Sequence, residues 1–292
     1  MSERRFSFVQ LDVFTHRPLE GNQLAVFTDA RGLTDREMQM LAKEMNLSET
    51  TFILPREKSI EENEGVQVRI FTVSEELPFA GHPTLGTAWC LQQKSGSEEV
   101  VLDLKVGKVP VRFEKRETLL FGEMRQAEPV FGAFHQRDDV AEVFGLPASE
   151  LNGDLPIQAV STGMQFIIVP FRSLETLQKL TVAWAQMEPY LRRQAKPSFF
   201  YFVCPVTPTS LHARMIFYNG EDPATGSAAG CCTAWAVHHG VLASDSQGLI
   251  EQGIEMGRPS AIYIRATKQG KGVTNVRVGG HVVHVVDGVV TM

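Results

Sequence analysis

The sequence is poor in features that mark membrane, nucleic-acid-binding and secreted proteins. Its 292 residues contain no run of 18 apolar residues, the length that suggests a membrane-spanning helix. The net charge of −6 is opposite to the basic surface that nucleic acids require. Residues 1–5 lead into an alternating strand pattern and not into an apolar signal segment. We therefore expect a cytoplasmic protein that binds neither membranes nor nucleic acids.

Cysteine and nucleotide-binding motifs are also scarce. The four cysteines, at positions 90, 204, 231 and 232, form no C-x-x-C pair, and no Cys/His spacing fits a zinc site. We expect them to be small buried residues and expect no metal. No G-x-G-x-x-G follows the first strand, no P-loop occurs, and Thr225–Gly230 does not match the G-x-S-x-G of hydrolases.

The chain length predicts two domains, at a typical length of about 150 residues each. Gly, Pro and charged residues mix between Gly122 and Asp139, as is typical of a boundary. We place the domains at residues 1–127, which the last C-terminal strand can complete, and at residues 128–292.

The second half of the chain repeats the first. Gly21–Val26 matches Gly163–Ile168, and Arg69–Gly81 matches Arg214–Gly226. In both copies a proline follows the arginine by nine residues (78 − 69 and 223 − 214). A repeat of this length indicates two similar domains and not a solenoid.

Local patterns predict the main elements. The capping box Thr34–Glu37 opens a helix that continues to about Met45. Alternating apolar residues predict a hairpin from 6–14 and 24–27 and strands at 50–54, 66–71, 100–106, 109–114 and 118–122. Further helices are predicted at 82–93 and 228–239, and the acidic stretch around Glu61–Glu64 is interpreted as exposed surface.

Each copy has a Pro/Gly turn directly ahead of a helix, at Pro78–Pro83 and at Asp222–Ser227. Glycine lets a ligand approach the backbone, and the free N–H groups of a helix start favour an anion. We expect the two helix starts, related by pseudo-twofold symmetry, to face one cleft between the domains and to hold a small carboxylate.

Four polar side chains near these turns are candidates for chemistry: Glu49, His82, Asp222 and Ser227. Each also has a plain structural interpretation: an exposed loop carboxylate for Glu49, a turn residue for Asp222, and helix caps for His82 and Ser227. The second copy has Phe199 near the place of Glu49, so only one candidate base is present. Apolar walls around that base would raise its pKa towards neutrality, as acid–base catalysis requires.

Several segments together resemble the phenazine-biosynthesis PhzF-like family of isomerases, over the whole chain. They are Asp12–Phe14 with Gly21-Asn22, Leu47–Thr50, Pro78–Thr84, Glu221–Ala228, Glu251–Gly253, Met256–Ser260 and Gly279-Gly280. The resemblance implies a diaminopimelate-epimerase-like α+β fold. In that fold two similar, pseudo-twofold-related domains each wrap a curved, mostly antiparallel sheet around a central helix. It also implies a homodimeric isomerase without cofactor or metal.

In the family's best-understood member a glutamate moves a proton between ring carbons of a cyclic dihydro-hydroxyanthranilate. By this resemblance Glu49 is the acid–base residue, with His82 and Asp222 as its catalytic partners. The implied substrate-binding residues are Gly81, Gly226, Ser227 and Asn22, with backbone N–H groups of both helix starts on the substrate carboxylate. One departure is Gln23, where the family often has proline after Gly-Asn.

Two-base epimerases of this fold carry a cysteine before the glycine of each helix start. Here these positions are Ala80 and Thr225, which excludes inversion by two thiols. The leading hypothesis is therefore an isomerase that shifts a proton within a small carboxylic acid. The alternatives are a non-catalytic protein that binds a small acid or acts as a scaffold, and an epimerase with a base other than cysteine.

Overall fold

A computed structural model describes residues 3–218 and 220–292 of the chain. These residues form two compact units. Unit 1 comprises the described residues up to Arg125 together with Gly279–Met292, and unit 2 comprises those of Gln126–Val278. The predicted boundary, between residues 127 and 128, lies two residues further along the chain. The last strand, which the sequence analysis allowed to complete the first domain, belongs to unit 1 from Gly279 onwards.

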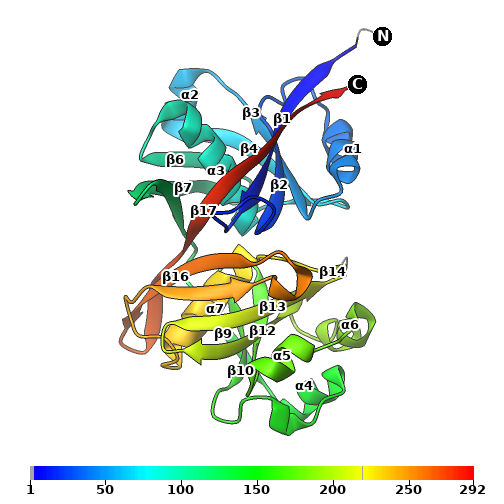
Figure 1. The fold of residues 1–292 in the computed structure, drawn as a ribbon, viewed down its shortest axis with the longest axis vertical. Coiled ribbons are helices and arrows are strands. Elements are labelled where there is room, and N and C mark those ends of the chain that lie inside the picture. The colour runs from blue at the N-terminus through cyan, green and yellow to red at the C-terminus, as the bar shows by residue number, and fades with distance from the viewer. Residues whose placement is uncertain (1–2, 219) are drawn as a thin grey trace. The chain divides into compact units, whose positions relative to one another are not determined.

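Strand pairing in unit 1 closes into a ring. The order around the ring is β1 (Arg5–Val13), β2 (Asn22–Phe27), β3 (Glu49–Leu54), β4 (Val66–Phe71), β6 (Glu99–Leu104), β7 (Gly107–Arg116), β8 (Leu119–Arg125) and β17 (Gly272–Thr291). The C-terminal part of β17 then pairs with β1 (Figure 1). The pairs β2–β3 and β4–β6 are parallel, and a short strand, β5 (Glu76–Leu77), pairs with β4.

Helix α3 (Gly81–Ser95) packs against strands β1, β2, β3, β6, β7 and β8 of this ring. Its first eight residues are all buried, so the helix is enclosed on every face over its first two turns. Gly86 allows the close approach: a Cβ there would lie 2.6 Å from Leu24 Cδ2 and 2.9 Å from Val13 Cγ2. Helix α1 (Asp35–Met45) packs against β3 and β4, and α2 (Lys58–Glu64) precedes β4.

Unit 2 repeats this topology pair by pair. Its strands are β10 (Ile157–Ser161), β11 (Gln165–Pro170), β12 (Ser198–Thr207), β13 (Ser210–Phe217), β14 (Gly220–Glu221), β15 (Gly248–Gln252) and β16 (Ser260–Gln269). The pairs β11–β12 and β13–β15 are parallel, as β2–β3 and β4–β6 are in unit 1. Helix α7 (Gly226–His238), the counterpart of α3, is almost wholly buried and packs on β10, β11 and β16.

Strand β9 (Val130–His135) pairs antiparallel with β10, as β17 pairs with β1 in unit 1. Unit 2 also has three further helices, α4 (Arg137–Phe144), α5 (Leu174–Lys179) and α6 (Trp184–Leu191), which share an apolar cluster. In that cluster Phe144 makes edge-to-face contacts with Phe200 and Phe202.

The matched sequence anchors occupy matched places in the two units. Arg69 donates two hydrogen bonds of 2.7 Å to Glu76, and Arg214 donates two of 2.8 Å to Glu221, seven residues away in each case. Each pair ties a long strand to the short strand that precedes the buried helix. Such bidentate pairs have a fixed planar geometry, so they hold the turn ahead of α3 and of α7 in a defined place.

Register extends the equivalence along the strands. Phe52 faces Arg69 across β3 and β4, and Phe202 faces Arg214 across β12 and β13. Three residues earlier in each strand (52 − 49 and 202 − 199) stand Glu49 and Phe199. The predicted asymmetry is therefore present in the fold: only unit 1 has a carboxylate at this place.

Most local predictions are confirmed. The α+β class, the hairpin of β1 and β2, and the Thr34 capping box on α1 agree with the structure. The four cysteines are free and buried. The acidic stretch lies at the surface, as expected, and it forms α2, which the sequence analysis did not predict; Lys58 pairs with Glu62 one turn on.

Two general findings concern the described residues. No helix in this part of the chain is long and apolar enough to cross a membrane. The same residues contain no group of three His, Cys, Asp or Glu side chains arranged to hold a metal ion.

Candidate active site

Glu49 is the first residue of β3, and strand alternation directs its side chain towards α3. Thr51, two residues on and on the same face, shares a 2.8 Å hydrogen bond with Thr87 of α3. Glu49 therefore lies level with the start of the helix, and its side chain is only 16% exposed. The interpretation of Glu49 as an ordinary exposed loop carboxylate is wrong.

His82, the second residue of α3, faces Glu49. Its Nε2 lies 3.5 Å from Glu49 Oε2, and its Nδ1 lies 3.3 Å from the amide nitrogen of Asn22. Burial lowers the pKa of His82 to about 3, although a hydrogen bond with the backbone of Gln23 opposes the shift. The imidazole is therefore neutral at physiological pH. It does not cap α3, because the N-cap residue is Ala80.

The start of α3 is suited to an anion. Ala80 has no side chain that can cap the helix, and Gly81 is buried. Pro83 has no N–H group, so the amides of Gly81 and His82 are the donors of the first turn. Glu49, His82, Asn22 and Gly81 thus come together in unit 1.

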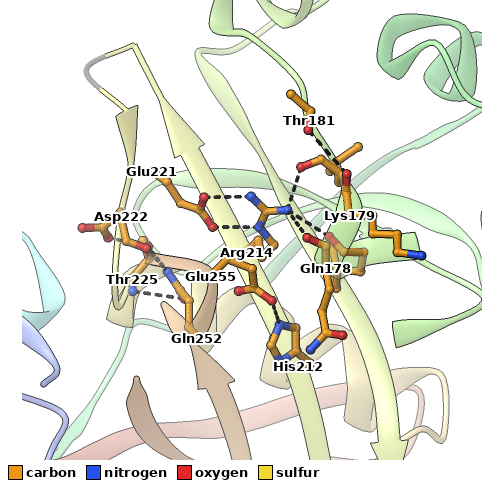
Figure 2. A network of polar contacts seen from close by, with 12 residues as sticks. Gln178, Lys179, Thr181, His212, Arg214, Glu221, Asp222, Thr225, Gln252 and Glu255 are labelled. Atoms are coloured by element: carbon orange, nitrogen blue, oxygen red, sulfur yellow. Dashed lines mark hydrogen bonds and ion pairs between the residues drawn. The ribbon is translucent and has the colours of Figure 1, made fainter. Parts of the chain in front are cut away.

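In unit 2 the turn ahead of α7 is held by a chain of hydrogen bonds (Figure 2). Thr225 Oγ1 donates to Asp222 Oδ2 at 2.5 Å, and Gln252 Nε2 donates to Thr225 Oγ1 at 3.0 Å and to the Asp222 carbonyl at 2.8 Å. Gln252 Oε1 accepts from the Thr225 amide at 3.3 Å and from the Tyr201 hydroxyl at 2.9 Å. Asp222 is buried, as are the other members of this chain of hydrogen bonds. It is therefore a turn residue whose carboxylate is also held in a defined orientation.

Ser227 and Gly226 begin α7. The N-cap is Thr225, so the interpretation of Ser227 as the capping residue is wrong. Ser227 is half-buried, and within the described residues its hydroxyl makes no hydrogen bond. The Gly226 carbonyl accepts from Gln126 Nε2 at 2.8 Å, which ties the helix start to the beginning of unit 2. Asp222, Gly226 and Ser227 thus lie together in unit 2.

Sequence reasoning assigned no role to Gln252, Tyr201 and Gln126. The sequence signals for Gln252 are its place in the family segment Glu251–Gly253 and before Gly253, where φ is +78° and a Cβ would lie 2.6 Å from the Pro223 carbonyl. That close approach brings β15 against the Asp222 turn. Tyr201 and Gln126 lie in a strand and at a unit boundary, where nothing in the local pattern distinguishes them. That the candidate residues of unit 1 and those of unit 2 line one shared cleft stays a prediction.

Comparison with known proteins identifies the family. The model of the phenazine biosynthesis-like proteins, PhzC-PhzF, matches residues 11–288. The chain belongs to this family. The predicted resemblance is confirmed.

Relatives and solved structures agree with this assignment. An uncharacterized isomerase of Mesorhizobium japonicum is 36% identical, with 97% of each chain covered. A trans-2,3-dihydro-3-hydroxyanthranilate isomerase of Pseudomonas aeruginosa is 33% identical, with 94% of this chain and 95% of the relative covered. The crystal structure of a PhzF family phenazine biosynthesis protein of Bacillus anthracis superposes with a TM-score of 0.87 and 26% identity, covering 98% and 99% of the two chains. The expected enzyme class, an isomerase, is thereby confirmed.

Proposed function

We propose that this isomerase moves a proton within a small carboxylic acid and that Glu49 is its acid–base residue. The observation that carries the proposal is the pair of Glu49 and a neutral, buried His82, whose facing atoms are 3.5 Å apart. Unit 2 has a phenylalanine at the equivalent place, so the fold itself does not require a carboxylate there.

The proposed reaction uses one carboxylate twice. Glu49 takes a proton from a carbon next to an unsaturated system, and the C–H electron pair shifts into that system. The protonated Glu49 then returns the proton to another carbon of the same molecule, which restores the carboxylate. Substrate and product are isomers, so the balance needs no oxidant or reductant.

The neutral state of His82 suits this cycle. A charged imidazolium at the same distance would stabilise the Glu49 carboxylate and oppose its protonation. A neutral imidazole leaves both protonation states of Glu49 accessible during turnover. Asn22, buried against His82, is proposed to orient the imidazole as well as to border the substrate.

The substrate carboxylate is proposed to bind the backbone N–H groups of the helix starts at Gly81 and at Gly226-Ser227. Their amides and the positive helix end favour an anion. Asp222 and Ser227 are proposed to orient an amino or hydroxyl group of the substrate. The relative from P. aeruginosa, named for trans-2,3-dihydro-3-hydroxyanthranilate, indicates a cyclic amino acid of this kind as the first compound to test.

We also infer that the two units descend from one duplicated module, in each of which the sheet surrounds its buried helix. The shared order of strand pairings and the two Arg–Glu pairs support this inference. A homodimer, a cytoplasmic location and independence of cofactors stay predictions.

The test is to incubate the protein in D₂O with trans-2,3-dihydro-3-hydroxyanthranilate and, separately, with a metabolite extract. Mass spectrometry then follows small acids that gain a deuteron or change retention time. Isomerisation with deuterium at a new carbon supports the proposal. Inversion of a stereocentre instead would indicate an epimerase. A ligand that raises the melting temperature without any exchange would indicate a binding protein.

A further inference from the structure

We infer that Gln252 and Tyr201 are positioning residues that hold the Asp222 carboxylate in its working orientation. The inference rests on the proposed function, in which Asp222 orients a polar group of the substrate. Neither residue touches the proposed reacting atoms, so both act through the Asp222–Thr225 turn.

Gln252 is completely buried, and its amide group is saturated with partners at both ends of that turn. One end is the Asp222 carbonyl, which accepts from Nε2 at 2.8 Å, and the other is the Thr225 amide, which donates to Oε1 at 3.3 Å. A single side chain therefore spans the turn and fixes its width (Figure 2).

The amide also sets the direction of the hydrogen bond to the carboxylate. Because Gln252 Nε2 donates to Thr225 Oγ1, the single hydroxyl hydrogen of Thr225 is left to donate to Asp222 Oδ2. The Tyr201 hydroxyl donates to Gln252 Oε1 and so favours the same orientation of the amide from the far side. The result is a directional chain that runs from Tyr201 through Gln252 and Thr225 to Asp222.

Unit 1 has the same strand pairings without a counterpart of this chain of hydrogen bonds. In the parallel pairs, Gln67 faces Asp103 and Ala213 faces Gln252. Arg69 and Arg214 are equivalent, so equivalent residues of β4 and β13 differ in number by 145. Gln67 is therefore equivalent to residue 212, one residue before Ala213. It follows that Asp103 is equivalent to the residue before Gln252, and that Leu104 of unit 1 is equivalent to Gln252 itself.

The same register gives the counterparts of the other members. Tyr201 faces Met215 as Thr51 faces Ile70, so Thr51 matches Tyr201. The offset of 145 matches Asp222 with Leu77 and Thr225 with Ala80. Unit 1 thus builds this region with three apolar residues and one threonine. Burying a glutamine amide is costly unless every bond is made, so its presence in unit 2 points to a role beyond packing.

The segment that carries Gln252 is itself anchored. Gly253 packs its Cα against the Pro223 carbonyl, and Glu255 in the following 3₁₀ turn lies 2.8 Å from His212 Nε2. Burial raises the pKa of Glu255, but the hydrogen bonds with His212 and the backbone, together with the charges of His212 and Arg214, lower the pKa overall. The glutamine is therefore presented to Asp222 from a fixed support.

The first test needs no substrate. In Gln252→Leu, which introduces the residue that unit 1 has at this place, crystal structures should show the Asp222 carboxylate displaced or in several conformers. Hydrogen exchange at the Thr225 amide should accelerate in the same variant. The matched control is Gln158→Leu, which removes another buried glutamine of unit 2, bonded to Gly132 and His239. In the control, Asp222 and the Thr225 amide should behave as in the wild type.

The second test is kinetic, with trans-2,3-dihydro-3-hydroxyanthranilate as the probe. A misplaced group can cost about 100-fold in rate, so we expect Gln252→Leu to lower kcat by about this factor while KM changes much less. Tyr201→Phe should lower kcat by a smaller factor, about tenfold, because Thr225 still orients the amide. Gln158→Leu should leave both constants unchanged.

Gln252→Glu supplies a pH signature that a purely structural role does not predict. The introduced carboxylate cannot donate to Thr225 or to the Asp222 carbonyl, whereas the single O–H of its protonated form can donate to one of them. Burial and the neighbouring Asp222 favour the protonated form. The ratio of variant to wild-type kcat should therefore rise as the pH falls.

An Asp222 carboxylate that keeps its wild-type position in Gln252→Leu overturns the inference, and so does a kcat ratio of Gln252→Glu that is flat with pH. If Gln252→Leu does not fold, Tyr201→Phe and Gln252→Glu decide the matter in the same assays. Failure of the proposed function looks different: Glu49→Gln would then retain turnover, or the wild type would not act on the probe. The crystal structures and the exchange rates still decide the positioning of Asp222 in that case.

Discussion

At the scale of single residues, His82 links the candidate site to the stability of unit 1. Its imidazole is buried and neutral in the fold, with a pKa of about 3 against 6.5 in its unperturbed state. Between these values the unfolded chain binds a proton that the folded chain does not. Stability due to this group is therefore complete above pH 6.5 and is lost as the pH falls towards 3.

We predict that His82→Gln has a shallower loss of stability in acid than the wild type. A difference of one bound proton between the unfolded and folded states changes the free energy of unfolding by about 1.4 kcal/mol per pH unit. Between pH 6 and 4 the free energy of unfolding of the variant should therefore fall less steeply than that of the wild type, by up to this amount per pH unit. Urea unfolding at a series of pH values measures it. His16→Gln, at an exposed position, is the control and should keep the wild-type slope. Equal slopes for His82→Gln and the wild type would contradict the assignment of a buried neutral imidazole.

The sequence selects His82 and Asp222 as candidates because each stands at a Pro/Gly turn, and it selects Glu49 through the family resemblance; their catalytic roles stay predictions. It could not show that Asn22 contacts His82, since this contact depends on β2 lying beside α3. Gln252 was beyond reach for a similar reason. A glutamine that is buried in a strand does not disturb the alternating pattern of buried and exposed residues around it. Only the fold reveals that its amide contacts a turn 30 residues earlier in the chain.

At the scale of elements, the two buried helices depend on glycines where other parts approach closely. A Cβ at Gly230 of α7 would lie 1.8 Å from Oε1 of Gln126, whose amide nitrogen holds the Gly226 carbonyl. Alanine is favoured over glycine in a helix by about 1 kcal/mol, but overpacking costs about 1–3 kcal/mol. The steric effect should win here because Gln126 is itself buried and hydrogen-bonded.

We therefore predict that Gly230→Ala lowers the free energy of unfolding by about 1–2 kcal/mol, despite the higher helix propensity of alanine. Chemical denaturation measures the change. In the double variant with Gln126→Ala the clash is gone, so the two changes should cost less together than the sum of the single changes. Additive costs would show that Gln126 does not fill the space at Gly230.

Elements with a local signature were predictable, and those without one were not. The capping box at Thr34 satisfies backbone donors of α1 within four residues, so sequence alone identifies that helix. Helix α2 lacks a side-chain cap and buries no residue, which leaves no apolar periodicity to detect. The sequence analysis allowed the last strand to complete the first domain, but not the order in which the strands of unit 1 close into a ring, because that order depends on pairing between distant segments.

At the scale of the whole molecule, β17 contributes residues to both units. Its first residues belong to unit 2, and from Gly279 onwards it completes unit 1 beside β1 and β8. At Gly279 the strand touches backbone: a Cβ would lie 2.5 Å from the Gly122 carbonyl and 3.1 Å from Glu123 Cα. Backbone atoms cannot move aside as side-chain ends can, so this crossing tolerates only glycine.

We predict that Gly279→Val destabilises unit 1 by about 3 kcal/mol or more, the upper end of the range for overpacking. Hydrogen exchange followed by mass spectrometry should show lost protection in β1 and β8. The control is Gly272→Val in the same strand, where a Cβ would have only one contact, at 3.6 Å. Protection in β1 and β8 that survives Gly279→Val would contradict the role of this crossing.

The central claim is that Glu49 carries the proton, and its most direct test compares three proteins in D₂O with the substrate found by the isotope screen. They are the wild type, Glu49→Gln and Glu44→Gln, the last removing an exposed carboxylate of α1 in the same unit. We predict that Glu49→Gln keeps its melting temperature but loses deuterium incorporation and isomerisation by at least about 1,000-fold, within the range expected for general acid–base catalysis. Glu44→Gln should match the wild type. Glu49→Gln that retains more than a few per cent of the wild-type rate would contradict the account.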